Sequence, residues 1–85
     1  MTVKELEETI LETARELYAK GPGFAQQAVV IREVAKRVDP RTIEEEQAIL
    51  STWHQLFRTG RLAWGFNLDS PGPPWFHFPT SDTSQ

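Results

Sequence analysis

Between residues 42 and 59, polar side chains recur at spacings of three and four, which places them on one face of a helix. The stripe contains Glu44, Gln47, Ala48, Ser51, Gln55 and Arg58, of which Gln47, Ser51, Gln55 and Arg58 could bond to bases, whereas Glu44 would repel phosphate. In the major groove of DNA, Gln can form two hydrogen bonds to adenine and Arg can form two to guanine. These four side chains are therefore candidates for reading base edges. The alternative is an ordinary solvent-exposed helix face.

Basic side chains gather around the same part of the chain. Residues 32–61 contain six basic and five acidic residues, whereas the whole chain has a net charge of −3. The acidic total argues against a protein that binds nucleic acid through overall charge, so any affinity for DNA would come from local placement. The candidates for phosphate contacts are Lys36, Arg37, Arg41 and Arg61. A mixed-charge surface without a ligand is the alternative.

Aromatic residues are concentrated near the C-terminus, where they form a third candidate site. They are Trp64, Phe66, Trp75, Phe76 and Phe78. Because alternate side chains of a strand face opposite sides, a two-stranded hairpin cannot bury all of them in one core. We therefore expect some aromatic surface outside the core, as at many protein interfaces. In the alternative, the first helix and the C-terminal tail cover it.

Residue types that support catalysis or metal binding are scarce. The chain has no Cys, which excludes disulfides, thiol nucleophiles and Cys-based metal sites. The two histidines, His54 and His77, have no ligands at zinc-binding spacing, and Gly21-Pro22-Gly23 lacks the Lys-Ser/Thr of a phosphate-binding loop. We expect structural histidines, no metal, no cofactor and no enzymatic activity.

Length and composition indicate one folded domain. The chain has 85 residues, of which 39% are hydrophobic and 25% charged, and such a chain is too short for a large enzyme scaffold. Its N-terminus is charged, and no apolar stretch approaches the ~20 residues needed to span a bilayer. We expect a soluble, cytoplasmic protein that does not enter a membrane. The domain should cover residues 1–79, with a flexible polar tail at 80–85.

Three helices are predicted from caps and apolar spacing. The capping box Thr2/Glu5 starts a helix that runs to Lys20, where a Gly-Pro-Gly break follows. A short helix runs from Val30 to Val38, and a third helix occupies 42–59. The segment 24–29 is either a short extended piece, which we favour, or the first turn of the second helix.

Beyond Gly60 the pattern alternates, which predicts a strand at 62–68. A Pro-rich loop at 69–74 then leads to a second strand at 75–78, and the two strands form a hairpin. The fold class is α+β. The expected core is Leu6, Ile10, Leu17, Val34, Val38, Ile43, Leu50, Trp53, Phe57 and Leu62.

This order of elements resembles the winged helix-turn-helix family. Residues 30–38 look like the family's second helix, and residues 56–65 look like the end of its recognition helix passing into the wing. The resemblance covers roughly residues 2–79 and implies a domain that binds double-stranded DNA, as a small regulator or as a subunit of a DNA-handling assembly.

A protein-interaction or dimerisation module is the alternative function. It is favoured by the negative total charge, by the run of acidic residues at 44–46, and by a wing that is aromatic where DNA-binding members have a basic tip.

Overall fold

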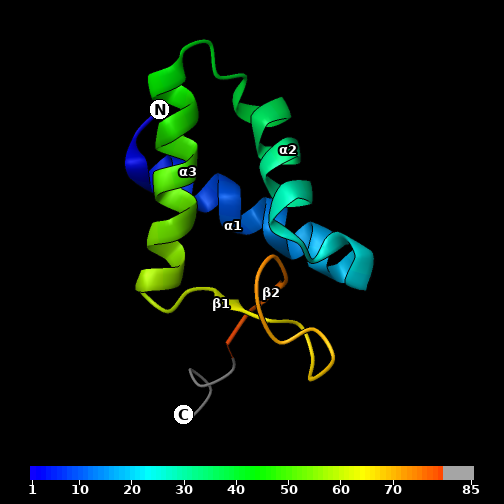
Figure 1. Cartoon of the computed structure of the whole chain (residues 1–85). Coiled ribbons are helices and arrows are strands. Elements are labelled where there is room, and N and C mark those ends of the chain that lie inside the picture. The colour runs from blue at the N-terminus through cyan, green and yellow to red at the C-terminus, as the bar shows by residue number, and fades with distance from the viewer. Residues whose placement is uncertain (80–85) are drawn as a thin grey trace.

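The computed structural model of the chain describes residues 1–79. Its architecture is α+β, with three α-helices followed by a two-stranded antiparallel hairpin (Figure 1). In the view of Figure 1, α1 lies behind α2 and α3, which stand side by side, and the hairpin lies below them. The arrangement matches the winged helix-turn-helix layout that the order of elements predicts.

Helix α1 (Val3–Lys20) begins at the predicted capping box. The Thr2 side-chain oxygen accepts a hydrogen bond from Glu5 N at 3.1 Å, and Thr2 N donates one to Glu5 Oε1 at 2.8 Å. The bond that Thr2 N donates stabilises the Glu5 carboxylate and is the main cause that holds the pKa of Glu5 below its ordinary value. The helix ends at Gly21, whose φ of 132° favours glycine, and a short 3-10 helix (Pro22–Phe24) follows.

Helix α2 (Gln27–Val38) begins three residues earlier than the predicted Val30. The preceding residue, Gln26, has an extended backbone and forms an isolated β-bridge with Trp75. Gln27 N then donates to Pro74 O at 2.9 Å. The favoured extended piece is thus present at Gln26, but residues 27–29 are helical. The helix ends before Asp39, which has a left-handed φ of 57°.

Helix α3 (Ile43–Arg58) follows a connection at residues 39–42, a length typical of a helix-turn-helix. Its N-cap is Thr42, whose side-chain oxygen accepts a hydrogen bond from Glu45 N at 3.1 Å. The Glu45 carboxylate reaches back to Arg41 N at 2.6 Å rather than to Thr42 N. The helix therefore begins where the sequence predicts, with two backbone donors satisfied by side chains.

The hairpin is shorter than predicted. Strands β1 (Ala63–Trp64) and β2 (Phe76–His77) pair antiparallel, with Trp64 opposite Phe76. The strand expected over 62–68 stops at Gly65, which has a φ of 104° and whose Cα lies so close to Pro71 that an added Cβ would be 2.5 Å from the Pro71 carbonyl oxygen. Side chains beyond Gly65 therefore do not continue to alternate between the two faces of a strand. Leu68, which such an alternation would place on the same face as the buried Leu62, is 96% exposed.

The core lies where the three helices meet the hairpin. At its centre is Trp53, fully buried on α3, with its ring centroid 5.6 Å from that of Phe76. The buried hydrophobic residues are Leu6, Ile10, Leu11, Ala14, Leu17, Ala25, Val30, Val34, Ile49, Trp53, Leu56, Leu62 and Phe76. The prediction was correct for Leu6, Ile10, Leu17, Val34, Trp53 and Leu62.

Four of the ten predicted core residues are placed differently. Ile43 and Leu50 on α3 are exposed, at 59% and 41%, and Val38 and Phe57 are half-buried. The buried side of α3 is centred on Ile49, and a helix in contact with its neighbours on one side buries only part of a broad apolar arc. The sequence analysis predicted burial for the side of α3 that carries Ile43 and Leu50, whereas the structure buries the side centred on Ile49.

Candidate functional site

The candidate base-reading side chains lie on the outward face of α3. The opposite side of the helix is buried and consists of Ile49, Thr52, Trp53 and Leu56. Gln47, Ser51 and Arg58 are exposed, whereas Gln55 is half-buried. The structure therefore places three of the four predicted residues on a free helix surface.

Gln55 and Arg58 are bonded to each other. The Gln55 side-chain oxygen accepts hydrogen bonds from Arg58 Nε at 3.1 Å and from Arg58 Nη2 at 2.8 Å. The two bonds orient the planar guanidinium group and leave its remaining donors available. In this arrangement Gln55 positions Arg58, so Arg58 is the better placed of the two to contact a ligand.

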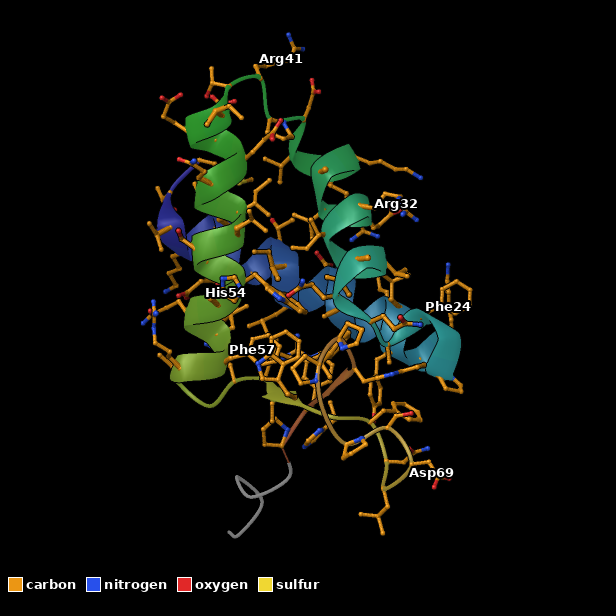
Figure 2. The ribbon with its side chains drawn as sticks, in the orientation of Figure 1. Phe24, Arg32, Arg41, His54, Phe57 and Asp69 are labelled. Carbon is orange, nitrogen blue, oxygen red and sulfur yellow. The ribbon has the colours of Figure 1, made fainter. Side chains whose placement is uncertain are left out.

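His54 belongs to the same surface, although the sequence analysis treated it only as a structural histidine. It is exposed on α3 (Figure 2). The spacings from Gln47 to Ser51, His54 and Arg58 are four, three and four residues, which keep all four on one helix face. This spacing was the signal in the sequence that could have identified His54.

The start of α3 is acidic. Glu44, Glu45 and Glu46 occupy its first turn and are exposed. Their negative charge complements the positive end of the helix dipole, which stabilises the helix locally. The same charges repel phosphate, so contacts between α3 and a DNA backbone are favoured toward its C-terminal half.

Arg37, one of the four candidate phosphate contacts, forms hydrogen bonds and ion pairs with other side chains of the protein. Its guanidinium donates to Glu16 Oε1 at 2.5 Å and to Thr13 Oγ1 at 2.9 Å, and lies 3.4 Å from the Glu33 carboxylate. The hydrogen bond to Glu16 raises the pKa of Arg37 above its ordinary value. These contacts join α2 to α1, so a structural role accounts for this residue.

The other three basic candidates are more available. The Lys36 side chain is 69% exposed and lies 3.9 Å from a Glu33 oxygen. Arg41 is 78% exposed in the turn before α3, where it pairs with Asp39 at 2.8 Å, and exposed ion pairs of this kind are weak. Arg61 is exposed just after α3 and forms no ion pair within residues 1–79.

The aromatic residues of the hairpin are packed together and against the helices. Phe76 is buried, and Trp64, Phe66, Trp75 and Phe78 are half-buried. Four ring contacts with residues of α1 and α3 contribute to this burial. The rings of Trp64 and Phe57 stack at 3.9 Å, and Tyr18 of α1 contacts Phe66, Phe76 and Phe78 at centroid distances of 5.8, 6.0 and 5.6 Å. Helix α1 therefore covers part of the aromatic surface, as the alternative expects of the first helix, whereas the tail at 80–85, which the same alternative includes, lies outside the described residues.

Large exposed apolar side chains are found on α3 and in the hairpin loop, and also at Met1, Val3 and Phe24. Ile43 and Leu50 are 59% and 41% exposed on one flank of α3, and Leu68 is 96% exposed in the hairpin loop. Sequence reasoning missed this α3 surface because it assigned both residues to the core.

The histidines and acidic residues do not converge on a metal-binding arrangement. Within residues 1–79 no three His, Cys, Asp or Glu side chains are grouped closely enough to hold a metal ion. His77 Nδ1 is 2.7 Å from the carbonyl oxygen of Gly65, a contact that helps to hold the hairpin. No helix in the described part of the chain is both long and apolar enough to cross a membrane.

The chain was compared with protein-family models, with curated proteins and with solved structures, and none of the three comparisons gave a match.

Proposed function

We propose that this chain is a non-enzymatic module of the winged-helix type that binds double-stranded DNA, as a small transcription regulator or as a subunit of a DNA-handling assembly. The observation that carries the proposal is the outward face of α3. This helix follows a short turn, its opposite side is buried, and the exposed face presents Gln47, Ser51, His54 and Arg58, with the acidic Glu44 at its N-terminal end.

The basic side chains near this face supply the phosphate contacts. Arg41 stands at the top of the turn before α3 (Figure 2), and Arg61 follows the end of the helix. A duplex laid along α3 would meet Arg41 at one end and Arg58 and Arg61 at the other. Arg37 does not belong to this set because its guanidinium is bonded to α1.

Fluorescence anisotropy with a labelled mixed-sequence duplex tests the proposal. Affinity should fall between about 50 and 200 mM salt, with a log–log slope of about −0.9 per phosphate contacted. Arg41→Gln should reduce the slope by about one contact. Arg32→Gln is the matched control, because Arg32 extends from the side of α2 turned away from α3 (Figure 2). An absence of binding at low salt would overturn the proposal.

A second candidate function is self-association through α3, and the exposed apolar flank of that helix favours it. Ile43, Leu50 and Phe57 are seven residues apart and therefore share one side of α3. A second α3 running antiparallel would cover Ile43 and Leu50. It would also bring the acidic first turn near Arg58 of the second copy, which is an electrostatically favourable arrangement.

Sedimentation equilibrium distinguishes the two functions. Self-association through α3 predicts a dimer that Leu50→Glu converts to a monomer. Ala48→Glu, an exposed position on the other flank of the same helix, should leave the dimer intact. A chain that is monomeric at all concentrations and binds DNA would exclude this second function.

A further inference from the structure

A hollow of about 680 Å³ is lined by residues of α1, of the segment that follows α3 and of the end of the hairpin, and it is not part of the outward face of α3. Helix α1 contributes Arg15, Tyr18 and Ala19 to its lining, and the opposite wall contains Gly60, Arg61 and Phe78. The residues come from three parts of the chain that only the tertiary fold brings together.

Two arginines face this hollow, and none of the lining residues within the described range 1–79 is acidic. Arg15 and Arg61 form no ion pair within residues 1–79. The basic side chains Arg37 and Arg41, by contrast, are both paired with carboxylates of the protein. The hollow is therefore a local concentration of positive charge on a chain whose total charge is −3.

The remaining wall is aromatic. The Arg15 guanidinium carbon lies 5.5 Å from the centroid of the Phe78 ring, within the range of a cation–π contact. Phe78 in turn meets Tyr18 edge-on at 5.6 Å and 90°. These contacts hold the Arg15 guanidinium beside an apolar surface, where a bound anion would be partly shielded from water.

We propose that this hollow binds a small organic oxyanion, that is, a phosphate or carboxylate group joined to an aromatic or aliphatic body. Guanidinium groups present paired donors that match the oxygens of either anion, which accounts for Arg15 and Arg61. The body of the ligand would lie against Phe78 and Tyr18 and bury apolar surface there.

Titration of the full chain with phenyl phosphate, followed by NMR chemical shifts and calorimetry, tests this assignment. Amide shifts should concentrate at Arg15, Tyr18, Gly60 and Arg61. Phenyl phosphate should bind more tightly than inorganic phosphate, because only the former has a body for the aromatic wall. Phenylacetate in a parallel titration shows whether the hollow prefers a carboxylate or a phosphate.

Loss of one charge-assisted partner should weaken phenyl phosphate binding by about tenfold or more in Arg15→Gln and in Arg61→Gln. Arg32→Gln, which removes an arginine outside the hollow, should have no effect. Both Arg15 and Arg61 are exposed, so the variants should fold, as a thermal melt of each would verify.

Three results would overturn the proposal. They are equal affinities for phenyl phosphate and inorganic phosphate, shifts that map away from the hollow, and an unchanged affinity in Arg15→Gln. Because Arg15 is not among the DNA contacts proposed above, Arg15→Gln should bind the duplex normally, so the two proposals can fail separately.

Discussion

The Trp53 indole Nε1 donates a hydrogen bond of 2.8 Å to the side-chain oxygen of Gln27. This bond joins the buried centre of α3 to the first residue of α2. Trp53 is fully buried, so its N–H cannot turn to bulk solvent if the bond is lost. The pair therefore helps to define the position of the two helices of the helix-turn-helix relative to each other.

Gln27→Ala should lower the free energy of unfolding by about 1 to 3 kcal/mol, because it leaves the buried indole N–H without an acceptor. Denaturant unfolding monitored by tryptophan fluorescence measures the change. Gln47→Ala is the control, since Gln47 is an exposed glutamine on α3 and should shift stability by less than about 0.5 kcal/mol. Equal effects of the two substitutions would show that the Trp53–Gln27 bond contributes little.

Gly65→Ala should destabilise the protein by about 1 to 3 kcal/mol or more. The backbone φ of 104° disfavours any side chain, and the new Cβ would lie 2.5 Å from the carbonyl oxygen of Pro71. Gly72→Ala in the same loop is the matched control, because no atom lies within 4 Å of its added Cβ. Thermal unfolding of the two variants compares them directly. A Gly65→Ala protein as stable as the control would contradict the observed hairpin geometry.

Arg37→Gln should reduce stability by about 1 kcal/mol, whereas Arg41→Gln should change it little. The Arg37 side chain is 34% exposed and contacts α1 through Glu16 and Thr13, whose hydroxyl is buried. Arg41 pairs only with Asp39, two residues away, at an exposed site. Chemical denaturation reports stability, and duplex binding should show the reverse order of effects. A loss of DNA affinity in Arg37→Gln without a loss of stability would return Arg37 to the phosphate-binding set.

The carboxyl group of Glu5 should titrate below the ordinary value of 4.5, because hydrogen bonds from the backbone and side chain of Thr2 stabilise its charged form. A carboxyl with a lowered pKa in the folded state stabilises the fold above the ordinary pKa. That contribution is lost as the pH falls through the lowered pKa. The N-terminal turn of α1 should therefore loosen in acid.

An NMR titration of the Glu5 side-chain carbon measures this pKa, and Thr2→Val provides the comparison. Removing the hydroxyl should raise the pKa of Glu5 toward 4.5. The same pKa in both proteins would show that the Thr2 hydroxyl does not contribute to the lowered pKa of Glu5.

Local signals in the sequence determined the identity and order of the elements. The capping residues Thr2 and Thr42 mark the starts of α1 and α3, and Gly21 marks the end of α1, because each acts on backbone groups within one helical turn. Apolar periodicity likewise placed Trp53 in the core and the polar stripe of α3 on its outer face. From these signals the α+β class and the arrangement of helices and hairpin could be predicted correctly.

Contacts between distant segments decided the rest. The start of α2 depends on the bridge between Gln26 and Trp75, and the end of β1 depends on the approach of Gly65 to Pro71. Arg37 is bonded to residues 21 and 24 positions away, so no local pattern distinguishes it from Arg41. No local pattern in the sequence indicates that Arg15 and Arg61 line one hollow either. The chain's caps and periodicity thus determined its elements, and only their packing decided which basic side chains remain available to a ligand.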